Sequence, residues 1–178
     1  MILQRLFAPR PAKVSGAALY RSAAAQARRP AFYRGLGAAD TPDGRFELYC
    51  LHVALLLMRL KGQGAAAAET AQALFDAFVR SLDDALRELG VGDLTVPKRM
   101  KTMGQAFYGR ARAYDDALAA LPDTTELDAL LARTAGAEMD APSQARLSAY
   151  VVGAAAALNA QPLGDLLEGR AAWPEAPE

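Results

Sequence analysis

The sequence predicts an all-α fold, a single-domain helical bundle of about six to eight helices. Hydrophobic residues make up 52% of the 178 residues, too many for a disordered chain and enough for one continuous core. Alanine, the residue with the highest helix propensity, is plentiful. Apolar side chains recur at three-and-four spacing along most of the chain, and no segment alternates as a half-buried strand does.

The first predicted elements are short. Residues 1–12 form an N-terminal amphipathic segment that ends at two prolines. A helix follows over residues 13–28, and Pro30 opens a helical turn over residues 30–36 that ends at glycines. These elements precede the most apolar part of the chain.

The next helix, over residues 44–61, is apolar around most of its circumference. Thr41 is the expected N-cap and Pro42 the first helical residue. Its polar residues recur every seven positions and form one narrow stripe: Arg45, His52 and Arg59. A helix that is apolar on nearly all sides normally lies in the centre of a bundle.

Two long helices are predicted next, over residues 66–89 and 97–121, each with one apolar stripe. Gly90 is expected to take the left-handed conformation that ends the first of them. Shorter helices follow: one begins at Thr124 or Thr125, and the others cover residues 142–160 and 163–167. We therefore expect one helical domain over residues 13–168 and a flexible, proline-rich tail over residues 169–178.

The residues needed for catalysis are scarce. The chain has one cysteine and one histidine, and Cys50 and His52 would point to nearly opposite sides of their helix. They therefore cannot form a nucleophile–base pair with each other, and a structural zinc site needs about four nitrogen or sulfur ligands. The sequence predicts no enzymatic activity, no cofactor and no metal.

Charge and hydropathy limit the cellular setting. The chain has 20 basic and 20 acidic residues, so net charge does not favour nucleic acid, and no sequence-specific nucleic-acid partner is expected. No stretch reaches the roughly 20 apolar residues that span a bilayer. The single Cys50 excludes an internal disulfide and fits a reducing compartment. We expect a cytoplasmic protein. Its N-terminal segment either makes a peripheral contact at the inner face of the cytoplasmic membrane or docks onto the body of the domain.

Three segments of the chain resemble the ubiquinol–cytochrome c chaperone family. They are Ala25–Tyr33, Gly44–Leu48 leading to His52, and the stretch from Asp83 through Val96–Lys101 to Tyr114. Together they cover about residues 20 to 120. The resemblance implies an all-helical chaperone for the cytochrome bc1 complex, whose mitochondrial relatives receive newly made cytochrome b near the ribosomal exit with a small partner protein. The composition and the lack of a mitochondrial presequence indicate a bacterial member.

The function that we expect is therefore assembly of the bc1 complex by binding, not turnover. The expected partners are cytochrome b or bc1 assembly intermediates, with the ribosome surface and the membrane as further candidates. An all-helical adaptor or regulatory module with a soluble partner is the alternative. Enzymatic activity is a third hypothesis, which a pocket containing two or more convergent carboxylates would favour.

Two groups of residues are candidate sites. The first shares one face of the helix over residues 97–121, opposite its apolar stripe, and is the expected partner surface: Lys98, Lys101, Tyr108 and Arg112. The alternative for this face is ordinary solvation. The second group is expected to be architectural and to fasten the connection between the two long helices: Asp83, Arg87, Gly90, Gly92, Asp93, Arg110 and Tyr114.

Overall fold

A computed structural model describes residues 11–177 and confirms the all-α class. In this part of the chain there are seven α-helices, one π-helical turn and no strand. In chain order they are α2 (Pro11–Ala27), the π-helical turn (Ala31–Gly35), α3 (Pro42–Leu60), α4 (Ala65–Glu88), α5 (Val96–Ala119), α6 (Thr125–Ala132), α7 (Ala141–Ala160) and α8 (Leu163–Leu167). The predicted amphipathic segment lies outside the described residues, except for its last two residues, which begin α2.

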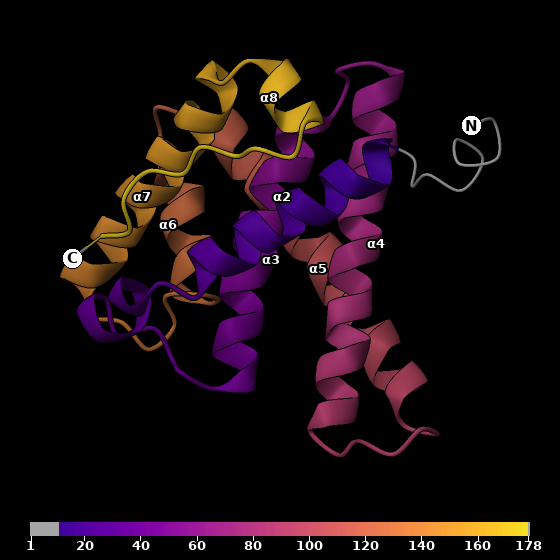
Figure 1. Cartoon of the computed structure of the whole chain (residues 1–178). Helices are drawn as coiled ribbons and strands as arrows, with labels where there is room; N and C mark the ends of the chain where they lie inside the picture. The colour runs from indigo at the N-terminus through magenta and orange to yellow at the C-terminus, as the bar shows by residue number, and fades with distance from the viewer. Residues whose placement is uncertain (1–10, 178) are drawn as a thin grey trace, which may run out of the picture.

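Helix α3 lies in the centre of the bundle, as its apolar circumference predicts. It packs against α2, α4, α5 and α7 (Figure 1). The helix begins as expected, because the Thr41 hydroxyl accepts a hydrogen bond from the Gly44 backbone N–H at 3.1 Å. Leu48, Leu51 and Leu56 are fully buried. The central position of α3 means that the other helices are arranged around its side chains.

Helices α2 and α4 cross in very close contact. A Cβ atom on Gly16 of α2 would lie 2.5 Å from the backbone nitrogen of Leu74 on α4, so only glycine fits there. The N-terminal half of α4 is fixed to the body in this way. The C-terminal end of α4, the N-terminal end of α5 and the connection between them extend away from the other helices (Figure 1).

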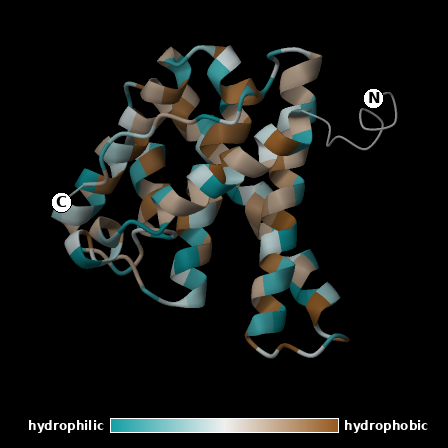
Figure 2. Cartoon of the chain, viewed as in Figure 1, coloured by the Kyte–Doolittle hydropathy of each residue, from teal (hydrophilic) through white to brown (hydrophobic). Residues whose placement is uncertain are grey.

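The projecting end of this α4–α5 hairpin includes hydrophobic residues (Figure 2), and two of them are exposed. Leu94 in the connection is 99% exposed, and Leu89 at the end of α4 is 63% exposed. Among the described residues four large apolar side chains are exposed, and three of them lie on this hairpin: Leu89, Leu94 and Tyr108. The hairpin therefore holds most of the large apolar side chains that are exposed in the described part of the chain.

The C-terminal segment differs from the flexible tail that the sequence predicts. Trp173 donates a hydrogen bond from Nε1 to the Ser22 hydroxyl at 3.0 Å, and the Gln26 amide donates to the Pro174 carbonyl at 3.0 Å. The Ala172 N–H donates to the side chain of Gln161 at 2.9 Å. The segment is fastened because its single tryptophan supplies an aromatic anchor that composition does not reveal.

Of the helices between residues 11 and 177, none is both long and apolar enough to cross a membrane.

Candidate partner-binding site

The four residues of the expected partner surface lie together on the solvent side of α5. Lys98, Lys101, Tyr108 and Arg112 are all exposed, whereas Phe107 and Tyr114 on the other side of the helix are buried. We refer to the surface formed by Lys98, Lys101, Gln105, Tyr108 and Arg112 as the α5 outer face. The structure places these side chains as the helical periodicity predicts.

Tyr108 is held in place although it is 62% exposed. Its ring lies 5.5 Å from the ring of Phe75 on α4 and 6.0 Å from that of Phe107, measured between centroids. A fixed, amphipathic ring costs little conformational entropy when it enters an interface, which is one reason why tyrosine is common in such surfaces. Tyr108 is therefore a suitable anchor for a partner.

Positive charge is concentrated on α5 before its last turn and a half. Between Val96 and Tyr114 the helix has five basic residues and no carboxylate: Lys98, Arg99, Lys101, Arg110 and Arg112. Arg110 is paired with Glu47, and Arg112 lies 3.7 Å from Asp116 in a contact that is open to solvent. In a chain whose net charge is zero, the α5 outer face is a local basic surface.

The connection between α4 and α5 is built by five of the seven residues expected to fasten it. Gly90 has φ of 76°; its N–H donates to the Arg87 carbonyl and the next N–H to the Leu86 carbonyl, which is a Schellman cap. The Arg87 guanidinium binds Asp83 at 2.7 Å and also binds Asp93 beyond the cap. The carbonyl of Gly92 accepts from the N–H groups of Thr95 and of Val96, the first residue of α5. This network fixes the angle at which α5 begins.

Arg110 and Tyr114 lie away from this connection, contrary to their predicted place. Arg110 is 14 residues beyond Val96, about 21 Å along the helix axis. It makes a two-bond ion pair with Glu47 of α3, in which the side chains are 25% and 14% exposed. Tyr114 is fully buried, and burial raises the pKa of its hydroxyl. These two residues join α5 to α3.

Sequence reasoning did not identify Glu47 as the partner of Arg110. The pair is separated by 63 positions, so no local spacing connects the two residues. The available signal was the position of Glu47, a carboxylate between Phe46 and Leu48 at the start of the most apolar helix. A carboxylate in such a place usually has a charged partner.

A buried polar network surrounds His52. Its Nδ1–H donates to the Leu48 carbonyl at 2.7 Å, so Nε2 is the acceptor for the Tyr150 hydroxyl at 2.8 Å. The Gln26 amide donates to the same hydroxyl at 3.0 Å. The ring packs edge-on against Phe32 and Trp173. Burial lowers the pKa of His52 to about 4, so the ring is neutral and holds α2, α3, α7 and the C-terminal segment together.

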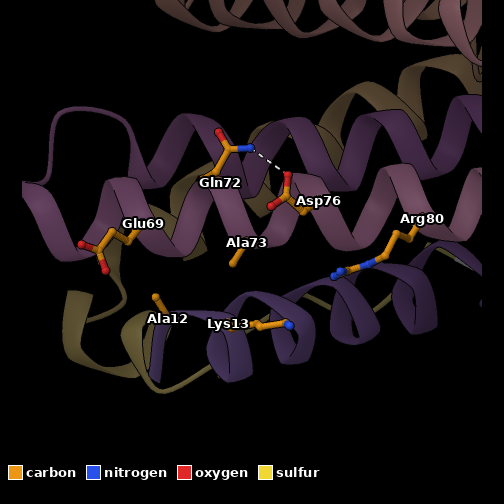
Figure 3. A pocket seen from close by; sticks show the side chains of 7 residues that line it. All are labelled: Ala12, Lys13, Glu69, Gln72, Ala73, Asp76 and Arg80. Carbon is orange, nitrogen blue, oxygen red and sulfur yellow. Dashed lines mark hydrogen bonds between the residues drawn. The ribbon is translucent and has the colours of Figure 1, made fainter. Parts of the chain in front are cut away.

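The surface of the described residues has two concave regions. One, of about 410 Å³, lies between α2 and α4, and Figure 3 shows the side chains that line it: Ala12, Lys13, Glu69, Gln72, Ala73, Asp76 and Arg80. Gln72 donates to Asp76 at 2.8 Å (Figure 3), and this lining has no thiol, hydroxyl or imidazole. The other, of about 370 Å³, lies between α3, α5 and α7 and has a mainly apolar lining.

The described residues bring no metal-binding set together. Between residues 11 and 177 no three histidine, cysteine, aspartate or glutamate side chains are grouped so that they could hold a metal ion. Cys50 is buried, and burial raises the pKa of its thiol, which keeps it protonated. The described residues also present a basic, aromatic helix face beside an exposed apolar hairpin tip.

These features define an all-helical protein with a basic, aromatic helix face. Comparison with known protein families shows that residues 34–173 match the family described as "Ubiquinol-cytochrome C chaperone". The chain belongs to this family. The crystal structure of the Cbp3 homolog from Brucella abortus is similar, with 36% sequence identity and a TM-score of 0.85. The alignment covers 99% of this chain and 98% of that one. A search of curated proteins gave no match.

Proposed function

We propose that the protein is a non-enzymatic assembly chaperone for the cytochrome bc1 complex that binds cytochrome b or the proteins assembling with it. The observation that carries this proposal is the match to the ubiquinol–cytochrome c chaperone family over residues 34–173. The similarity to the Cbp3 homolog over nearly the whole of both chains supports it. A binding role also agrees with the basic, aromatic outer face of α5.

We assign partner binding to the α5 outer face. Its cations are exposed to solvent, where they can meet an acidic partner, and its one exposed aromatic ring is already fixed by Phe75. Arginine and tyrosine are enriched among the residues that contribute most to protein interfaces. Because the face is exposed, its substitution can be separated from damage to the fold.

The test is a double charge reversal, Lys98→Glu with Lys101→Glu, in cells that assemble the bc1 complex. We expect normal thermal stability, loss of co-purifying cytochrome b and a reduced level of assembled bc1 complex. The loss should be greatest at low salt, because salt screens exposed charges. A matched control is Lys13→Glu with Arg21→Glu, which makes the same charge change on exposed positions of α2.

Two results would contradict the proposal. If the α5 variant folds normally and retains wild-type capture across salt concentrations, the outer face is not the binding site. If deletion of the protein leaves bc1 assembly unchanged and its partner is one soluble regulatory protein, the adaptor function replaces the chaperone function.

A chaperone for a membrane protein works close to the bilayer, and we propose that residues 1–12 make a reversible contact with it. This segment combines apolar and basic side chains: Ile2, Leu3, Leu6, Phe7, Arg5 and Arg10. The intact protein should float with liposomes that contain anionic lipid, and a protein lacking the segment should not. Equal flotation of both proteins would exclude this contact, and sedimentation with ribosomes tests the ribosome surface separately.

A further inference from the structure

The groove between α3, α5 and α7 exposes apolar side chains that the chain itself does not cover. Its volume is about 370 Å³, and nine of its twelve lining residues are apolar. Four large apolar side chains of this lining are partly exposed: Met58, Leu118, Leu121 and Val152. Covering them with another apolar surface would remove them from water, which favours association.

The charges of the groove are already satisfied within the chain. Its lining includes two charged side chains, Arg59 and Asp115. Arg59 donates to two backbone carbonyls at the C-terminal end of α7, at 2.8 and 3.0 Å, where the helix dipole favours a cation. Asp115 pairs with Lys61 at 2.6 Å. The wall that α7 supplies has no charged residue, because none follows Arg146 in this helix. A segment that fills the groove is therefore uncharged, since burying an unpaired charge is costly.

The edges of the groove are formed by small residues. Ala119 at the end of α5 and Ala156 on α7 both line it and are exposed. Small side chains on a helix surface let the backbone of another helix approach closely. A groove with an apolar lining between two helices is also the usual receptor for the apolar face of a third helix.

A second copy of the chain fits the groove poorly. Two copies related by a twofold axis would place the same surface opposite itself, groove against groove, and leave both unfilled. The large apolar side chains that are exposed in the described residues lie outside the lining: Val14, Leu89, Leu94 and Tyr108. The groove is therefore better filled by a different molecule.

We propose that this groove receives an uncharged, apolar helix of a membrane-protein client. The inference deepens the proposed function, on which it rests for the identity of the client. Membrane-spanning helices are stretches of about 20 predominantly apolar residues, and one that has not yet entered the bilayer exposes them to water. Ala119 is seven residues beyond Arg112, so the groove continues the same side of α5 as the outer face. One client can then contact both surfaces of this helix.

The experiment places a photoreactive amino acid at Asn159, an exposed residue of the groove, in the full-length protein in its native host. Mass spectrometry then identifies the crosslinked peptide, for which we expect an uncharged apolar segment of a membrane protein. Ala156→Glu and Ala156→Lys put either charge into the groove, and each should lower the crosslink yield about tenfold. Ala119→Lys tests the opposite edge in the same way. Raised salt should not lower the yield, because apolar contacts are not screened.

The matched controls are Ala68→Glu and Ala68→Lys, at an exposed alanine of α4 that does not line the groove. All five variants should keep the wild-type melting temperature, and the two controls should keep the crosslink yield. Opposite effects of Glu and Lys at position 156 would show binding by charge and overturn the inference.

The identity of the crosslinked molecule separates this inference from the proposed function. A crosslink to a second copy, a charged peptide, lipid or nucleic acid, or no crosslink, would overturn the inference. Capture of cytochrome b that the groove variants leave unchanged would overturn it and leave the proposed function standing. An apolar helix of a membrane protein outside the bc1 complex, lost in the groove variants, would support the inference and contradict the proposed function.

Discussion

Lowering the pH should destabilise the fold through His52 before most carboxylates are protonated. The pKa of this buried imidazole is about 4 in the folded protein, whereas an unfolded histidine titrates near 6.5. Below pH 6.5 His52 therefore binds a proton in the unfolded chain but stays neutral in the folded protein. The stabilisation is complete above pH 6.5 and is lost as the pH falls toward 4. The loss in the free energy of unfolding amounts to about 2 kcal/mol at pH 5.

Urea unfolding of the wild-type protein and of His52→Gln between pH 7.5 and 4.5 measures this contribution. Glutamine keeps polar atoms near Leu48 and Tyr150 but does not titrate. For each protein, the free energy of unfolding at pH 7.5 is the reference for its values at lower pH. The wild-type protein should lose about 2 kcal/mol more than the variant between pH 7.5 and 5. Equal losses would mean that His52 accepts a proton without opening the network around it.

Other predictions concern side chains that join distant parts of the chain. Arg110→Ala leaves Glu47 poorly solvated and should lower the free energy of unfolding by about 2 kcal/mol. Adding Glu47→Gln should recover part of this loss. Purely additive losses in urea unfolding would show that the two residues are not coupled. Trp173→Ala removes the anchor of the C-terminal segment and should cost about 3 kcal/mol, with faster proteolysis after Gly169; unchanged protection would show that other contacts hold the segment. Leu56→Asp should abolish cooperative unfolding, because it places an unpaired charge in the centre of the bundle; an unchanged midpoint would rule out that position.

Helix positions could be predicted because periodicity and end signals are local. The predicted range 163–167 is identical to α8, and the predicted 97–121 differs from α5 by one and two residues at its ends. The central position of α3 followed from its apolar circumference. The solvent side of α5 followed from the same periodicity, so all four residues of the expected partner surface are exposed.

Contacts between distant residues could not be predicted in the same way. The partner of Arg110 is 63 positions away, and the partner of His52 is Tyr150, 98 positions away. Both pairs form because the packing of helices brings them together, and no spacing rule in one sequence encodes that packing. Trp173 illustrates the same limit, since a single aromatic in a proline-rich segment gives no sign of the network that it joins.

The fold separates stability from binding along α5 itself. On one side of this helix Phe107, Tyr114 and Arg110 join it to the body, and their replacement should unfold the protein before it affects a partner. On the other side Lys98, Lys101, Tyr108 and Arg112 are exposed. Substitutions of exposed residues usually change stability little. Partner binding on this side, as proposed above, can therefore be tested by variants that keep the fold intact.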